Sequence, residues 1–102
     1  MPEPNNGTLR EWSDYLHELL MESSAASGSG DSAQMRTCQD KLNPFERRSP
    51  PTADLLDQIA LSTVIALHVT NAEERTKVLQ DRIEDYRRIR KLIDSVAEGN
   101  KA

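Results

Sequence analysis

The chain has 102 residues, enough for one small domain. Hydrophobic residues make up 36 %, the net charge is −4, and Leu, Ile, Val and Phe together contribute about a fifth of the residues, near the lower limit for a self-sufficient core. No apolar stretch is long enough for a membrane span, and one cysteine excludes a disulfide framework. Because no secretory signal is visible either, we expect a cytoplasmic or nuclear protein.

The first predicted element is an amphipathic helix over residues 8–22, preceded by a leader over residues 1–7 that we expect to be disordered. Thr8 and Glu11 form a capping box, in which the hydroxyl and the carboxylate satisfy free backbone N–H groups at a helix start. An apolar stripe at helical spacing contains Leu9, Trp12, Leu16 and Leu19. Since an isolated helix of this length is marginal in water, we expect it to dock onto another surface.

Two linkers and a short helix are predicted next. Residues 23–33 are Ser, Gly, Ala and one Asp, so they offer little to bury and predict a flexible linker. Residues 34–45 predict a short helix with an apolar stripe, and residues 46–52 predict a second, proline-containing linker.

The longest element is predicted over residues 53–98, which contain no glycine or proline, and a disordered tail is expected over residues 99–102. Apolar residues keep one heptad register through both halves, as in Ile65, Leu79 and Ile93. This register favours one helix of coiled-coil type, continuous or kinked near residues 69–72.

A helical hairpin is the alternative for this segment. Thr70 with Glu73, and Asn71 with Glu74, both match a capping box and would start a new helix. In either case no second strand is available for a sheet, so the predicted fold class is all-α.

No residue pattern predicts catalysis. The two histidines, His17 and His68, have no second histidine or cysteine at ligand spacing, and Cys38 lies on an apolar stripe typical of a buried thiol. We therefore expect a protein that is not an enzyme, with no metal, no cofactor and no small-molecule substrate.

The predicted function is that of a helical scaffold or adaptor subunit in a multi-subunit complex, assembled through coiled-coil or helical-bundle packing. Its partners would be other helical subunits, in a hetero-oligomer rather than a homo-oligomer. The predicted partner-binding residues are Leu9, Trp12, Leu16, Leu19, Leu61, Ile65, Leu67, Leu79, Ile83, Tyr86, Ile89 and Ile93. We expect the helix around Trp12 to be a contact separable from the long helix, and the isolated chain not to be a stable compact monomer.

A basic cluster within residues 82–91 supports an alternative function. Its arginines would bind an anionic partner, such as nucleic acid or an acidic surface. Acidic residues interleave with these arginines at helical spacing, which is typical of a solvated coiled-coil flank, and nucleic acid is therefore not the expected partner.

Overall fold

The computed structural model describes residues 9–43 and 54–99, and all regular secondary structure in these ranges is helical. The four helices described are α1 (Leu9–Ser29), α2 (Ser32–Leu42), α4 (Asp54–Leu67) and α5 (Ala72–Gly99). This result confirms the all-α prediction for the described residues. The predicted leader, the proline-containing linker and the tail beyond Gly99 lie outside them.

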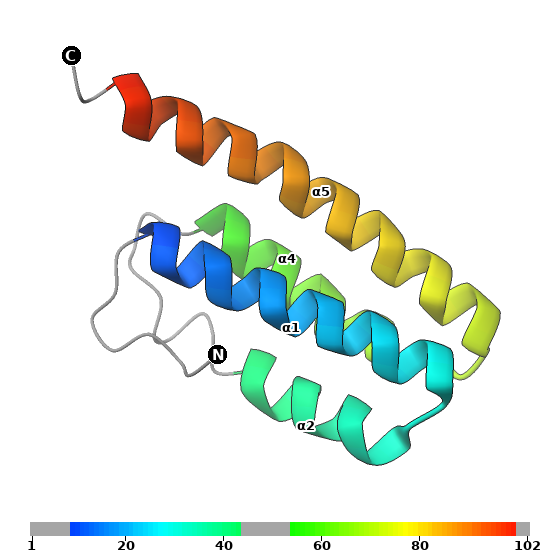
Figure 1. Ribbon diagram of the computed structural model, residues 1–102. Coiled ribbons are helices and arrows are strands. Elements are labelled where there is room, and N and C mark those ends of the chain that lie inside the picture. Colours follow the sequence, from blue (N-terminus) through cyan, green and yellow to red (C-terminus); the bar gives the residue numbers. More distant parts are fainter. Residues whose placement is uncertain (1–8, 44–53, 100–102) are drawn as a thin grey trace.

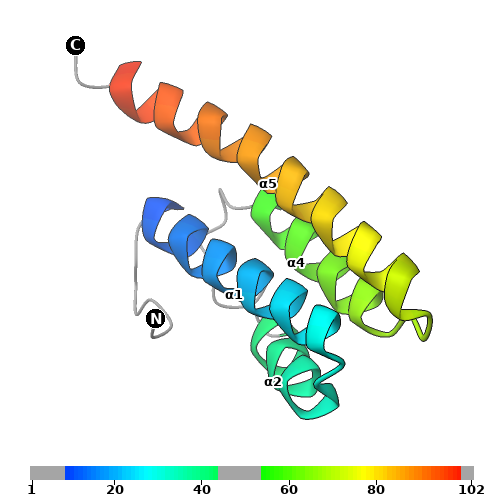
Figure 2. The same ribbon diagram turned by 45° about the vertical axis from the view of Figure 1, so that its right-hand side comes forward.

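The helices form an up-down-up-down bundle (Figure 1). Consecutive helices pack against each other, and α5 also packs along α1, which closes the ring of four. α1 and α4 run side by side between α2 and α5 (Figure 2). The chain has a radius of gyration of 13.7 Å, close to the ~13 Å expected for a compact domain of about 100 residues.

The predicted flexible linker over residues 23–33 is wrong, because α1 continues through most of it. Ser23, Ala26 and Ser27 are buried, so these small side chains let neighbouring helices approach α1 closely. The hydroxyl of Ser23 donates a hydrogen bond to the Leu19 carbonyl at 2.7 Å and is thereby satisfied inside its own helix. Tertiary packing thus outweighs the low helix propensity of serine and glycine.

A tight turn joins α1 to α2 where the linker was expected. Gly30 has a φ of 70°, which glycine adopts without steric cost. Asp31 then caps α2, because its carboxylate accepts a hydrogen bond from the backbone N–H of Gln34 at 3.0 Å. The short helix predicted over residues 34–45 is observed as Ser32–Leu42, and Phe45 lies outside the described residues.

The favoured continuous or kinked helix over residues 53–98 is also wrong, and the helical hairpin is what forms. α4 ends at Leu67, and a turn reverses the chain before α5 begins. Asn71 caps α5 by accepting a hydrogen bond from the N–H of Glu74 at 2.9 Å, as its capping box indicates. Folding back lets the apolar faces of α4 and α5 cover each other instead of remaining in water.

One core lies between the four helices. Its largest fully buried hydrophobic side chains come from each of them: Leu16, Leu19, Leu20, Cys38, Leu42, Leu56 and Leu79. Trp12 and Tyr86 belong to the same cluster, although the sequence analysis assigned them to separate contacts. The predicted independence of the first helix is therefore wrong, because its apolar stripe is buried against α5.

Arg75 joins three helix ends near the α4–α5 turn. It is 8 % exposed, and its Nε donates a hydrogen bond to the hydroxyl of Ser27 at 2.9 Å. Its two terminal nitrogens donate to the Ser27 carbonyl at 3.4 Å and to the Val69 carbonyl at 3.1 Å. Carbonyls at the C-terminal ends of helices are partly unsatisfied and carry partial negative charge, so they compensate this buried cation.

Leu79→Ala is expected to lower the free energy of unfolding by about 2–5 kcal/mol, because it opens a cavity beneath a fully buried side chain. Urea denaturation followed by circular dichroism measures this change. Leu92→Ala is the matched control on the same helix, and because Leu92 is exposed it should change stability by less than about 0.5 kcal/mol. Equal effects of the two variants would contradict the observed orientation of α5.

Arg75→Met is expected to lower the free energy of unfolding by about 1.5–3 kcal/mol, because it removes charged hydrogen bonds to the end of α1 and to the turn after α4. Lys77→Met, which removes an exposed cation two residues along, is the control and should have little effect. The same denaturation experiment compares the two, and an Arg75 variant as stable as the Lys77 variant would show that this junction is dispensable.

Candidate functional site

The bundle buries most of the residues predicted to bind partners. Of the twelve, only Leu61 and Ile65 are exposed, with 57 % and 62 % of their surface accessible. Three are partly buried against the core: Leu9, Ile89 and Ile93. Seven lie within the core: Trp12, Leu16, Leu19, Leu67, Leu79, Ile83 and Tyr86.

Leu61 and Ile65 form, with Gln58, the outer face of α4. The three residues are spaced by three and four positions, so they lie on one side of the helix, opposite the side that carries buried Leu56 and Leu67. Five large apolar side chains are exposed among the described residues, and three of them, at positions 55, 61 and 65, belong to α4. The apolar surface is thus concentrated on one helix.

A groove runs between α4 and α5 beside this face, with a volume of about 440 Å³. In this α4–α5 groove, the α4 wall is formed by Leu55, Gln58, Ile59 and Ser62. The α5 wall is formed by Arg82, Asp85, Arg88 and Ile89. Gln58 belongs to both the groove and the outer face of α4, so the two surfaces are continuous.

Sequence reasoning missed two exposed apolar residues, one of which lines this groove. Leu55 is 52 % exposed on α4, and Leu92 is 62 % exposed on α5. Both lie off the heptad register that was used to select partner-binding positions. The register gives no signal that would have found them, since Leu61 and Ile65 lie on it and are exposed, whereas Ile83 lies off it and is buried.

The basic cluster of residues 82–91 is largely neutralised by neighbouring carboxylates. Arg82 pairs with Asp85 at 2.9 Å, and Arg87 pairs with Glu84 at 3.2 Å. Arg90 is held by carboxylates from both α1 and α5. This pairing weakens the electrostatic field that an anion-binding surface would need.

A polar network fastens α1 to α5. The hydroxyl of Tyr86 donates to the Ser13 carbonyl at 2.9 Å, while His17 stacks on the Tyr86 ring with centroids 5.2 Å apart. Arg90 donates to the hydroxyl of Ser13 at 3.0 Å and to the carboxylate of Asp14. Burial opposes the charge of Arg90, but its hydrogen bonds to Asp14, Tyr86 and Asp94 outweigh burial and raise the pKa of the guanidinium. These hydrogen bonds and the ring stacking hold α1 against α5.

Cys38 is fully buried and lacks the setting of a reactive thiol. Burial raises the pKa of its thiol, although a hydrogen bond with Ser23 partly offsets that rise. A cysteine nucleophile requires the opposite shift, toward the thiolate at neutral pH.

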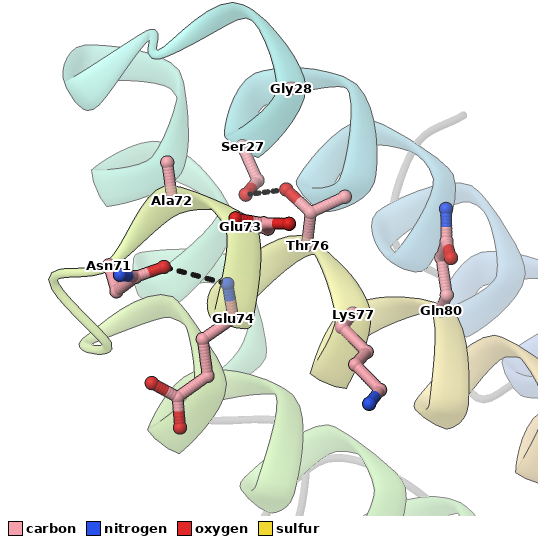
Figure 3. A pocket seen from close by; sticks show the side chains of 9 residues that line it. All are labelled: Ser27, Gly28, Asn71, Ala72, Glu73, Glu74, Thr76, Lys77 and Gln80. Carbon is pink, nitrogen blue, oxygen red and sulfur yellow. Dashed lines mark hydrogen bonds between the residues drawn. The ribbon is translucent and has the colours of Figure 1, made fainter.

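A shallow hollow of about 780 Å³ lies where the end of α1 meets the start of α5 (Figure 3). Its wall includes the hydrogen bond between the hydroxyls of Ser27 and Thr76, which are 2.9 Å apart, and the capping bond of Asn71. Glu73, Glu74 and other exposed polar residues of α5 form the rest. These hydrogen bonds belong to helix ends, so we assign the hollow a structural role.

Comparison of the chain with protein-family models, with curated proteins and with solved structures finds no match. In residues 9–43 and 54–99, no group of three or more His, Cys, Asp or Glu side chains could hold a metal ion. Across the same part of the chain, none of the helices combines the length and apolarity needed to cross a membrane. The surface beside α4 is therefore the candidate functional site.

The ion pair between Arg10 and Asp94, at 3.0 Å, should make stability depend on pH. The hydrogen bond from Arg10 holds the pKa of Asp94 below its ordinary value, burial opposes this shift, and Arg90 adds to it. A carboxylate with a lowered folded-state pKa contributes stability that is present above about pH 3.9, its unfolded value, and is lost as the pH falls through the folded-state pKa.

Asp94→Asn is accordingly expected to reduce stability at neutral pH and to make progressively less difference as the pH falls through the folded-state pKa of Asp94. Thermal melts across this pH range measure the effect. In an Arg10→Gln background, Asp94→Asn should reduce stability by a smaller amount, because Asp94 has then already lost one of the two arginines that pair with it. A constant difference between the proteins at all pH values would contradict this origin.

Proposed function

We propose that this protein is a non-enzymatic helical adaptor that binds a helical subunit of another protein through the outer face of α4. The single observation that carries the proposal is the exposure of Leu61 and Ile65 on that face. The two residues are four positions apart, so their side chains are neighbours on the helix surface.

The composition of the chain strengthens this reading of the outer face. Large aliphatic residues are scarce, and the bundle uses most of them in its core. Scattered exposed apolar residues are ordinary on protein surfaces, but here they gather on one helix beside a groove. Burying one exposed leucine or isoleucine at an interface contributes about 1.5–3 kcal/mol, which makes the pair a suitable binding anchor.

The hairpin changes how an assembly would form. A long coiled-coil seam is not offered, because Leu79, Ile83 and Tyr86 are buried within the bundle. The proposed adaptor instead presents one preformed helix, and a partner helix would pack against it as in other helical bundles.

The alternative function, binding of an anionic partner through residues 82–91, has weaker support. Carboxylates of the same chain pair with Arg82, Arg87 and Arg90, and the whole chain carries a net charge of −4. Nucleic-acid binding domains ordinarily show a strong basic excess instead.

The combined variant Leu61→Glu with Ile65→Glu is expected to lose the helical proteins that co-purify with the full chain at fixed stoichiometry. Two charges would have to be desolvated in an apolar contact, so binding should weaken at least about 100-fold. Quantitative affinity purification from cells that express the tagged chain measures this loss. The variant should unfold at nearly the same temperature as the parent, because both positions are exposed.

The matched control is Ala25→Glu with Ala33→Glu, which adds the same charge at exposed positions on α1 and α2. The control should retain the co-purifying proteins. If the α4 variant also retains all of them, the outer face of α4 is not the binding site and the proposal fails.

A further inference from the structure

We infer that the α4–α5 groove takes an amphipathic helix of another protein whose flanks carry acidic side chains. The inference rests on the proposed function, because it specifies the chemistry of the partner helix that α4 would bind. It is carried by the shape, the apolar residues and the charge of the groove.

The apolar residues of the groove form a line that a helix can follow. Leu55 lies at one edge on α4, and Ile89 faces the groove from α5. Leu92 follows Ile89 by three residues and therefore continues the same side of α5. α5 also extends beyond the first turn of α4 (Figure 1). Apolar side chains spaced by one or two turns on a partner helix would match such a line.

The charge of the groove indicates which charged side chains the partner helix should carry on either side of its apolar stripe. Two arginines, Arg82 and Arg88, share one carboxylate, that of Asp85. Arg88 has 79 % of its side chain exposed and lies 4.0 Å from Asp85, so its pairing is loose. Carboxylates pair closely with most of the basic cluster, but Arg88 is held loosely, so the groove lining keeps an excess of one positive charge that is complementary to a carboxylate.

A second copy of the chain fits the groove less well. Each copy brings two arginines and one aspartate, and that aspartate already serves its own arginines. Two grooves placed face to face would leave like charges opposed in an apolar contact, which is unfavourable. The charge balance therefore indicates a different protein as the occupant.

The test uses the full chain and two fluorescent synthetic helices that share one leucine stripe, one with glutamate flanks and one with lysine flanks. In fluorescence anisotropy titrations, the chain should bind the glutamate-flanked helix at least about ten-fold more tightly than the lysine-flanked helix. Arg88→Glu should remove or reverse this preference. Leu55→Ser should weaken binding of both helices, because it removes apolar contact without changing charge.

Arg87→Glu is the matched control for Arg88→Glu. It makes the same change of charge one residue away, at an exposed arginine that also pairs with a carboxylate three residues earlier, but it does not line the groove. It should leave the preference unchanged. Equal effects of the two variants would overturn the inference, since only the net charge of the chain would then matter.

Three other outcomes would also overturn it: binding of neither helix, equal binding of both, or a dimer in sedimentation that Leu55→Ser dissociates. Failure of the proposed function is distinguishable from these results. If the variant of Leu61 and Ile65 loses its co-purifying proteins while the groove shows no charge preference, that combination would support the proposed adaptor function and reject the acidic partner helix. If the groove discriminates between the helices but that variant keeps its partners, the outer face of α4 is not the contact.

Discussion

The fold depends on how a buried cation is compensated at the place where the chain reverses. Arg75 belongs to the first turn of α5, where a positive charge is unfavourable to its own helix. Its guanidinium instead binds the carbonyl of Ser27 near the end of α1 and the carbonyl of Val69 in the turn after α4. These contacts satisfy groups that a helix end leaves free, and they set the position of α5 against both helices. Further along the same two helices, the network around Tyr86 adds to the α1–α5 contact.

The closed bundle also determines what remains for binding. Because the chain has few large aliphatic residues, a core of this size uses most of them. Leu61 and Ile65 are left on the outer face of α4, next to a groove with an excess of arginine. The candidate site is therefore formed by residues that lie outside the core. Its apolar and charged residues come from α4 and α5, which the hairpin brings together.

Local chemistry accounts for the elements that sequence reasoning predicted correctly. Helical spacing of Trp12, Leu16 and Leu19 indicates the start of α1. The capping box at Asn71 marks the start of α5, but it supported only the alternative to the favoured continuous helix. The same reasoning failed for residues 23–33, since serine and glycine predict a linker unless a neighbouring helix buries them. It also favoured a continuous helix over residues 53–98, because a heptad register does not reveal whether the covering surface comes from another chain or from the same one.

The sequence by itself determined that the chain is helical, which residues are apolar enough to be buried, and where helices can begin. These properties are local, because they depend on spacing along one helix and on side chains within one turn of its end. Only the tertiary structure decided that α4 and α5 fold back on each other, that Trp12 shares a core with Leu79, and that Leu61 and Ile65 stay exposed. The physical reason is that burial is a property of pairs of surfaces. The apolar stripe of one helix shows that its burial is favourable. Which stripes are buried depends on how all the helices pack together.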